Sequence, residues 1–303
     1  MRKQTAVIGL ILALALSFSG CGGTDGKDNA DTGADKSKTE DSQGKVPADG
    51  KEQSNQYEFK KEKLTAESGE HKVVGILFQP QTEEPCPLVI VSHGFSANYT
   101  YYVDICEELA SKGIAAVAID FYGGSKKSLS GGTMEEMTVF TEQQDLEAMI
   151  DVAKASEKID AERIFLIGHS QGGFVSTLVA AERPEEIKGL YLIAPAYHIP
   201  DAMRAAFASY EEIHSFTQSG GTVGVPYAQA VYHYDIFETM VKYTGKVHIY
   251  HGEEDEAVDM SYSERAVETF ENAELTKVPK MAHNVFDMIQ SDICDEIAVD
   301  AGR

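Results

Sequence analysis

The stretch IFLIGHSQGG occupies residues 164–173. Its first four residues are apolar and typical of a buried strand, and a helix-compatible pattern begins at Gln171. Between the two lies the pattern G-x-S-x-G, centred on Ser170. A serine on so sharp a strand-to-helix turn needs glycine two residues before and after it, because larger side chains would collide there. The stretch therefore predicts a nucleophilic serine above the edge of a sheet, although a glycine-rich turn that merely carries a serine has the same pattern.

A serine nucleophile needs hydrogen-bond donors for the oxyanion that forms during the reaction. The backbone N–H of Gln171, free at the start of the predicted helix, is one candidate. The second is the N–H of Phe95, in the sequence His-Gly-Phe that follows the apolar run 87–92. Gly94 lets the backbone approach closely, and the Phe95 side chain remains free to pack in the core. We therefore predict an oxyanion hole formed by Phe95 and Gln171.

Strand-like and helix-like patterns alternate along most of the chain. Residues 57–64 and 72–78 alternate polar and apolar residues, which predicts an antiparallel hairpin. After it, short apolar runs indicate strands buried on both faces, separated by helices. This order predicts an α/β fold with a mostly parallel central sheet and helices on both faces. The further predicted strands are 87–92, 114–119, 164–167, 188–193, 246–250 and 273–279, and the predicted helices are 101–112, 134–155, 261–270, 285–297 and one that follows Ser170.

The alternation breaks between residues 197 and 244. This part contains several aromatic residues, three histidines (His198, His214 and His233) and the loose run 218–222, but no strand of the core type. We interpret residues 197–244 as a cap inserted over the active site.

A serine nucleophile requires a general base, and that base requires a carboxylate to orient it. His283 lies between the last predicted strand and the last predicted helix, which is the expected place for the base. Asp255 follows the predicted strand 246–250 and is the candidate acid. Alternatives remain open at both positions. Glu254 is the rival acid, in a loop whose acidic residues could simply be solvated, and the three cap histidines are the rival bases.

From Tyr57 to the C-terminus the chain resembles a serine α/β-hydrolase. In that fold the nucleophile, the acid and the histidine follow one another along the chain, as Ser170, Asp255 and His283 do here. The resemblance rests on HGF at 93–95, GHSQGG at 168–173, HGEED at 251–255 and AHN at 282–284.

The chain is most similar to bacterial cinnamoyl (feruloyl) esterases, with which it shares LIAPA at 192–196 and a short cap. The resemblance implies that the cap covers the acyl pocket. It also implies that a tyrosine in a G-x-x-Y stretch contacts the phenolic hydroxyl of the substrate. That stretch is Gly224–Tyr227 here, so Tyr227 is a candidate substrate contact.

The N-terminal residues 1–20 have the three parts of a signal peptide: a basic start, an apolar run at 6–16, and small residues before Cys21. The apolar run is shorter than the roughly 20 residues that a transmembrane helix needs. Residues 18–21, FSGC, resemble a bacterial lipobox, which implies that Cys21 is lipid-modified and anchors an extracytoplasmic protein to the cell membrane. Ordinary secretion, with Cys21 incidental, is the alternative.

Residues 21–56 are rich in Gly, Ser, Thr, Asp and Lys and contain no aromatic residue before Tyr57. They cannot bury enough apolar surface to offset the entropy of ordering, so we predict a disordered tether. The remaining residues, 57–303, suit one α/β-hydrolase domain. Three cysteines in this part, Cys86, Cys106 and Cys294, have no metal-ligand spacing and are expected as buried thiols, with one disulfide at most.

The full chain of 303 residues has a formal net charge of −23, which argues against nucleic acid as a partner. We expect a serine carboxylic ester hydrolase acting on small or hydroxycinnamoyl-type esters, for which no metal or organic cofactor is needed. Two alternatives remain. The same triad could serve a peptidase of the aminopeptidase type, a thioesterase or a lipase, or the scaffold could be a non-catalytic surface binding protein.

Overall fold

The computed structural model describes residues 56–284 and 286–303. The predicted signal peptide, the lipid-modified Cys21 and all of the predicted tether but its last residue lie outside these ranges.

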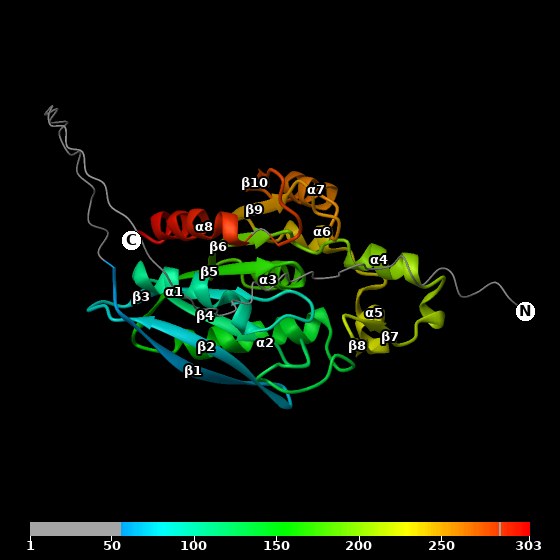
Figure 1. Ribbon diagram of the computed structural model, residues 1–303, viewed down its shortest axis with the longest axis horizontal. Helices are drawn as coiled ribbons and strands as arrows, with labels where there is room; N and C mark the ends of the chain where they lie inside the picture. The colour runs from blue at the N-terminus through cyan, green and yellow to red at the C-terminus, as the bar shows by residue number, and fades with distance from the viewer. Residues whose placement is uncertain (1–55, 285) are drawn as a thin grey trace, which may run out of the picture. The chain divides into compact units, whose positions relative to one another are not determined.

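The centre of the protein is an eight-stranded sheet with the order β1-β2-β4-β3-β5-β6-β9-β10 (Figure 1). The hairpin β1–β2 is antiparallel and joins β4 in an antiparallel pair, whereas every later pair in the sheet is parallel. The carboxyl ends of the parallel strands therefore meet at one edge, where ligands bind in such sheets. The bounds are β1 (Phe59–Ser68), β2 (His71–Pro80), β3 (Cys86–Ser92), β4 (Ala115–Asp120), β5 (Ile159–His169), β6 (Ile187–Ile193), β9 (Lys246–Gly252) and β10 (Ala273–Val278).

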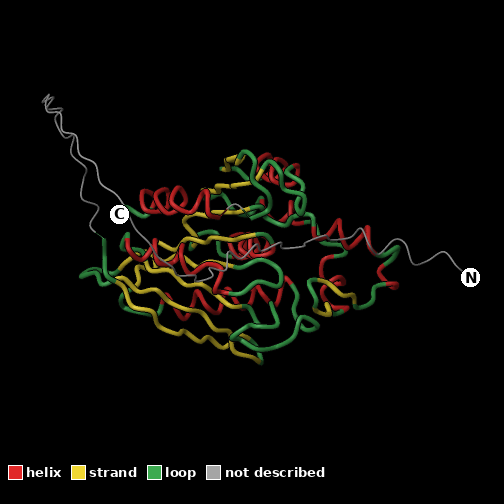
Figure 2. The backbone as a smooth tube through the Cα atoms, viewed as in Figure 1, coloured by secondary structure: helices red, strands yellow, loops and turns green. Residues whose placement is uncertain are grey.

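Helices cover both faces of this sheet (Figure 2). Successive side chains of a strand point to opposite faces, so Leu88 and Ile90 of β3 join one apolar cluster and Val89 and Val91 join the other. Both faces of β3 are buried, which explains why its sequence is continuously apolar. The first cluster contains residues of α2 (Val139–Lys154) and α3 (Gln171–Glu182), and the second contains residues of α1 (Val103–Ser111) and α8 (Phe286–Asp300).

Two predicted helices have different starts in the structure. The helix predicted from residue 134 begins at Val139, because Thr138 caps it: its Oγ1 accepts from Thr141 N, and Thr141 Oγ1 accepts from Thr138 N. This reciprocal capping satisfies backbone donors that a longer helix would have used internally. The helix predicted from residue 101 starts as the 3₁₀ helix η2 (Tyr99–Tyr102) and becomes α-helical only at Val103. The other predicted elements differ from the observed ones mainly in length.

Between β6 and β9 the chain forms short elements. Figure 1 shows α4, α5, β7 and β8 together at one end of the molecule. The strands β7 and β8 form a small antiparallel hairpin of their own rather than joining the central sheet. The loop that precedes α2 packs on this hairpin, since Lys126 Nζ donates to the backbone oxygen of Gly220. The bounds are α4 (Ile199–Ala206), η3 (Tyr210–Glu212), β7 (Phe216–Gln218), β8 (Gly221–Val223), α5 (Val225–Val231) and α6 (Ile236–Met240), and α7 (Ser261–Thr269) follows β9.

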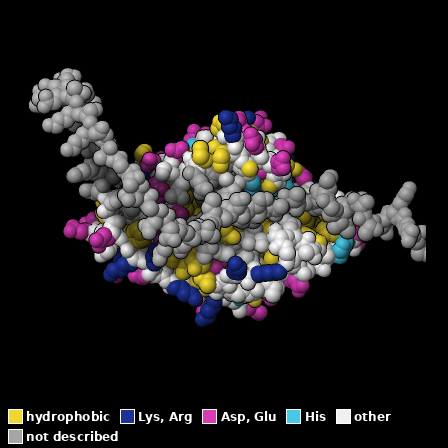
Figure 3. All heavy atoms as spheres, in the orientation of Figure 1, with side chains coloured by type: hydrophobic (Ala, Val, Ile, Leu, Met, Phe, Trp, Pro, Cys, Tyr) yellow, Lys and Arg dark blue, Asp and Glu magenta, His cyan; other side chains and the backbone are white. Residues whose placement is uncertain are grey.

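Acidic side chains are spread around the visible surface rather than gathered in one patch, and basic side chains lie mostly along its lower part, with a further group at the top of the view (Figure 3). Cys86, Cys106 and Cys294 are all buried free thiols, as expected. Within residues 56–284 and 286–303, no helix is both long and apolar enough to cross a bilayer.

Candidate active site

Ser170 occupies a strained backbone conformation between β5 and α3. Its φ of 55° and ψ of −119° lie in a region that residues with a side chain rarely adopt. Neighbouring backbone holds the turn in place: Ser170 N donates to Ile193 O over 2.9 Å, and Ser170 O accepts from Ala196 N over 2.9 Å. A Cβ on Gly172 would lie only 2.2 Å from Ser92 O, so this position requires glycine. The G-x-S-x-G stretch thus forms the turn that the sequence predicted.

His283 and Asp255 come together from two different loops. His283 Nδ1 lies 2.8 Å from Asp255 Oδ2. The other carboxylate oxygen, Oδ1, accepts from the backbone N–H groups of Ala257 and Val258 over 2.8 and 2.9 Å. Glu254, the rival acid, is exposed and has no such contact with His283 among the described residues. Of the two acids, Asp255 is therefore the one that contacts the histidine.

The Asp255 carboxylate is also held by a second histidine, His251, whose Nε2 lies 3.2 Å from Asp255 Oδ2. The same ring is fixed by Val258 O at 3.0 Å from Nε2 and by Ser263 Oγ at 2.7 Å from Nδ1. Burial raises the pKa of Asp255, but the hydrogen bonds with His251 and His283 outweigh it and leave this pKa well below its usual range. Sequence reasoning did not find the contact between His251 and Asp255.

The second ring nitrogen of His283, Nε2, is buried and has no hydrogen-bond partner in the described part of the chain. Because Nδ1 faces a carboxylate, it carries the proton, and Nε2 is left as a free acceptor. No hydrogen bond between Ser170 Oγ and His283 occurs among the described residues, although the two residues are linked through His169. His169 Nε2 lies 3.3 Å from the backbone oxygen of His283, and the two rings are 5.0 Å apart.

The loop with the predicted oxyanion donor passes close over the serine. A Cβ on Gly94 would lie 3.1 Å from Ser170 Cβ. The Phe95 N–H donates to no protein acceptor in the described part of the chain, and Gln171 is the first residue of α3. Phe95, Ser170 and Gln171 line one pocket, so both amides belong to residues beside the nucleophile.

The same pocket is closed by residues of the segment between β6 and β9. Its apolar lining includes Ala196, Ile199, Ala202 and Met203, and its polar lining includes His198, Gln218 and Tyr227. The pocket therefore combines an apolar wall with a few polar groups, as is usual for small-molecule sites.

Tyr227, the predicted substrate contact, lies in this pocket but already uses its hydroxyl hydrogen. Its Oη donates to Gln171 Oε1 over 2.6 Å, and Gln171 Nε2 donates to Glu142 Oε2 over 2.8 Å. Burial raises the pKa of Glu142 to about 8, so its carboxyl is largely protonated near neutral pH. This series of hydrogen bonds links α5 to α2 through Gln171, the residue after the serine. Sequence reasoning missed Glu142, because a glutamate within a long helix resembles any solvated one.

Comparison with known proteins identifies the family of this chain. Residues 83–234, half of the chain, match the family described as Serine aminopeptidase, S33. The chain belongs to this α/β-hydrolase family. The predicted α/β-hydrolase fold is thereby confirmed.

Several hydrolases resemble this chain in sequence or in structure. Est1E from Butyrivibrio proteoclasticus, solved with ferulic acid bound, is 28% identical with a TM-score of 0.69, over 78% of this chain and 96% of Est1E. Mouse monoglyceride lipase is 32% identical over 111 residues, 37% of this chain and 35% of the lipase. The match thus spans about a third of that relative. A monoacylglycerol lipase from Paleococcus ferrophilus, 15% identical with a TM-score of 0.59 over 75% of this chain and 99% of that one, shares the fold.

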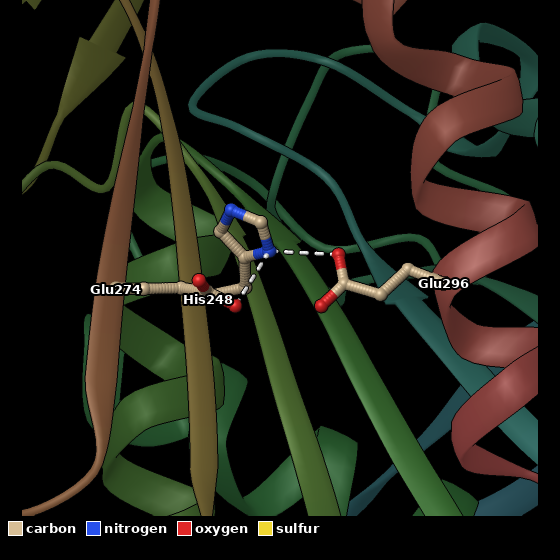
Figure 4. Close-up of side chains that lie close together, drawn as sticks. All are labelled: His248, Glu274 and Glu296. Atoms are coloured by element: carbon tan, nitrogen blue, oxygen red, sulfur yellow. Dashed lines mark hydrogen bonds and ion pairs between the residues drawn. The ribbon is translucent and has the colours of Figure 1, made fainter.

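One group of described side chains has the composition of a metal site. His248 of β9, Glu274 of β10 and Glu296 of α8 each offer a ligand atom, all within 4.8 Å of one another (Figure 4). Their own contacts account for this arrangement. His248 Nδ1 lies 2.7 Å from Glu296 Oε2, and His248 Nε2 lies 2.7 Å from Thr276 Oγ1. Lys246 Nζ is 2.7 Å from Glu296 Oε1, and its positive charge opposes a cation there. We interpret the cluster as an ion-pair network.

Proposed function

We propose that this S33-family hydrolase is a serine carboxylic ester hydrolase in which Ser170, His283 and Asp255 form the catalytic triad. The observation that carries the proposal is the 2.8 Å contact between His283 Nδ1 and Asp255 Oδ2. His283 Nε2 is left buried and without a hydrogen-bond partner in the described part of the chain, while His169, the residue before the strained Ser170, contacts the His283 backbone. An imidazole oriented in this way by a carboxylate is the arrangement that activates a serine hydroxyl.

In the proposed reaction, Ser170 rotates its hydroxyl toward His283 Nε2, which takes the proton as Oγ attacks the ester carbonyl carbon. The oxyanion accepts hydrogen bonds from the N–H groups of Phe95 and Gln171. His283 then gives its proton to the oxygen of the leaving alcohol, and the carbon–oxygen bond to that alcohol breaks. Water, deprotonated by His283, cleaves the acyl-enzyme in the same way and restores Ser170. Asp255 stays ionised throughout, since its pKa lies well below its usual range.

The proposed substrates are small or hydroxycinnamoyl-type esters. Two observations support the aromatic acyl group: the similarity to Est1E, whose structure holds ferulic acid, and a pocket lined by apolar side chains together with Tyr227. Because the Tyr227 hydroxyl hydrogen is donated to Gln171, Tyr227 would accept, rather than donate, a hydrogen bond from a phenolic hydroxyl.

A lipase, thioesterase or peptidase with the same triad is the rival function. The match to mouse monoglyceride lipase supports the lipase, and the description of the S33 family as serine aminopeptidases supports the peptidase. All of these reactions form an acyl-enzyme on Ser170. A lipase differs from the proposed esterase in the acyl group of its substrate, whereas a thioesterase and a peptidase differ in the bond, thioester or amide, that breaks as the acyl-enzyme forms.

Ester hydrolysis by the full-length protein in detergent distinguishes these proposed functions. We expect methyl ferulate to be cleaved with a higher kcat/KM than p-nitrophenyl acetate or p-nitrophenyl octanoate, and Ser170→Ala to abolish all three activities with the fold intact. Turnover by Ser170→Ala at the wild-type rate would refute the triad. A preference for octanoate would favour the lipase. Labelling of Ser170 by a fluorophosphonate without cleavage of any ester would favour the peptidase or thioesterase, and no labelling would favour a non-catalytic binding protein.

We also propose that Cys21 carries lipid and holds the enzyme at the outer side of the cell membrane, with residues 22–56 as its tether. The support is the sequence FSGC at residues 18–21 after an apolar run. Cys21→Ala should move the protein from the membrane fraction into the medium or the soluble fraction, while Cys106→Ala, a buried thiol, should not. Retention of the Cys21→Ala protein in the membrane would contradict the proposal.

A further inference from the structure

The side-chain amide of Gln171 is held at both of its ends. Its Oε1 accepts from the hydroxyl of Tyr227 over 2.6 Å, and its Nε2 donates to Glu142 Oε2 over 2.8 Å. All three side chains are buried, so water does not compete for these hydrogen bonds. Because they come from α3, α5 and α2, the amide joins three elements at the residue that follows the nucleophile.

The peptide group between Ser170 and Gln171 carries the N–H that Gln171 is proposed to offer to the oxyanion. Its direction depends on Ser170, whose backbone has the strained φ of 55° and ψ of −119°. A strained conformation persists only where its surroundings hold it firmly. The oxygen of this peptide group accepts from Ala196 N over 2.9 Å. On its other side, the doubly bonded side-chain amide fixes the residue that bears the N–H.

Glu142 supplies one half of this attachment from a position where a carboxyl group is costly to bury. Its other oxygen, Oε1, is buried and has no partner, so the bond with Gln171 is the one hydrogen bond of this carboxyl among the described residues. Burial raises the pKa of Glu142 to about 8, so near neutral pH the group is largely uncharged. It therefore holds Gln171 without placing a full negative charge close to the oxyanion hole.

Stability alone does not account for these polar residues. Replacing both partners of a buried hydrogen bond by apolar side chains of the same shape can be nearly neutral for stability. An apolar pair would thus fill the space between α2 and α3 without the cost of a buried carboxyl. Direct contact with substrate does not account for Glu142 either, because it does not line the pocket that Ser170 and Gln171 share.

We propose that Glu142 is a positioning residue for the oxyanion hole, which holds the Gln171 side chain and thereby the direction of the Gln171 backbone N–H. The inference rests on the proposed ester hydrolase activity and adds a residue to its mechanism. Oxyanion donors act through their fixed orientation toward the charge that forms in the transition state. Loosening one of them should therefore lower kcat and leave substrate binding nearly unchanged.

The test is a double-mutant cycle in the full-length protein, with p-nitrophenyl acetate as substrate. Glu142→Leu removes the acceptor, and Gln171→Met removes the side-chain amide but keeps the backbone N–H. We expect each variant to lose about tenfold in kcat with KM within about twofold, less than the roughly 100-fold or greater loss when an oxyanion donor is removed outright. The double variant should also lose only about tenfold, since both changes break the same contact.

A boronic acid reports on the oxyanion hole without turnover. As it binds, Ser170 Oγ forms a bond to boron, His283 takes the hydroxyl proton, and an oxygen of the tetrahedral anion occupies the oxyanion hole. We expect the Ki of phenylboronic acid to rise about tenfold in Glu142→Leu. Glu142→Gln keeps an oxygen that accepts from Gln171, so it should restore both kcat and Ki to within about twofold of wild type.

Glu147→Leu is the matched control, since Glu147 lies in the same helix but is partly exposed and accepts from Gln143. It should keep the wild-type kcat and Ki. Dividing each rate by the amount of protein that a fluorophosphonate labels removes the effect of any misfolded fraction. A melting temperature that falls in Glu142→Leu while kcat and Ki stay unchanged would assign Glu142 to stability alone and overturn the inference.

The remaining outcomes are also decisive. A roughly hundredfold loss in the double variant would show that Glu142 and Gln171 act independently, which overturns the inference. If Glu142→Leu does not fold, Gln171→Met still tests the same attachment, and a wild-type kcat in that variant overturns the inference while leaving the ester hydrolase intact. A wild-type protein that neither cleaves an ester nor reacts with the fluorophosphonate overturns the proposed function and this inference together.

Discussion

The ring of His169 lies against the ring of His283, with centroids 5.0 Å apart, and its Nε2 is 3.3 Å from the His283 backbone oxygen. Its other nitrogen, Nδ1, is 3.0 Å from the hydroxyl of Tyr102, and that hydroxyl accepts from Gly94 N over 3.2 Å. The residue before the nucleophile therefore connects the loop of the proposed base with the loop of the proposed oxyanion hole.

Because of these contacts, we expect His169 to act as a positioning residue. His169→Phe keeps a ring against His283 but removes both hydrogen bonds. We expect kcat to fall about tenfold, in line with about 1.4 kcal/mol for the lost contacts. A change in the pH dependence of kcat should accompany it, since His283 loses its fixed orientation. A lower melting temperature with an unchanged pH profile would assign His169 a structural role only.

The choice of the acid can be tested with two neighbouring residues. Asp255→Asn removes the carboxylate that holds His283 Nδ1–H, and we expect kcat to fall about 10⁴-fold, as for the same change in other serine triads. Glu254→Gln changes the net charge equally in the same loop but touches an exposed side chain, so it should stay within about twofold of wild type. The reverse ranking of the two variants would show that the proposed triad has the wrong acid.

The role of Tyr227 can be separated from its packing by a pair of substrates. Tyr227→Phe keeps the ring but removes the hydroxyl that contacts Gln171. Methyl ferulate and methyl cinnamate differ in the ring substituents, including the phenolic hydroxyl. We expect the variant to lose about fivefold of its preference for ferulate, the effect of one hydrogen bond of about 1 kcal/mol. An equal loss on both esters would mean that Tyr227 acts by holding Gln171 rather than by binding the phenol.

The buried Glu142 predicts a pH dependence of stability. Its pKa in the folded protein, about 8, is raised by burial above the value of about 4.3 in an unfolded chain. Its contribution to stability is therefore complete below about pH 4.3 and is lost as the pH rises through about 8. The free energy of unfolding of the wild type should therefore fall by on the order of a few kcal/mol between pH 5 and 9, and Glu142→Gln should abolish this fall. Urea unfolding at each pH measures both proteins.

Glu157→Gln, an exposed change of the same charge, is the control for Glu142→Gln and should follow the wild-type curve. If the Glu142→Gln protein loses stability with rising pH as steeply as the wild type, Glu142 is not the group responsible.

Much of the fold follows from local pattern, because apolar periodicity and glycine sterics act over a few residues. The continuous apolar run of β3 and the G-x-S-x-G turn are examples, and both were predictable. The ends of the helices were harder to predict. The residue types from 134 to 138 are all compatible with a helix, so the sequence does not mark where the helix begins. The observed start at Val139 depends on whether Thr138 and Thr141 bond to each other rather than to solvent.

The amino-acid sequence by itself determined the fold class, the turn that carries Ser170, and the candidate residues for acid and base. It favoured Asp255 as the acid but left Glu254 as an alternative, since both are carboxylates in one loop and only the path of that loop decides which of them faces His283. It likewise could not predict that His251 holds the Asp255 carboxylate, with His251 Nε2 3.2 Å from Asp255 Oδ2. These choices depend on contacts between segments far apart in the chain, and such contacts exist only once the sheet and its helices have brought the loops to one edge.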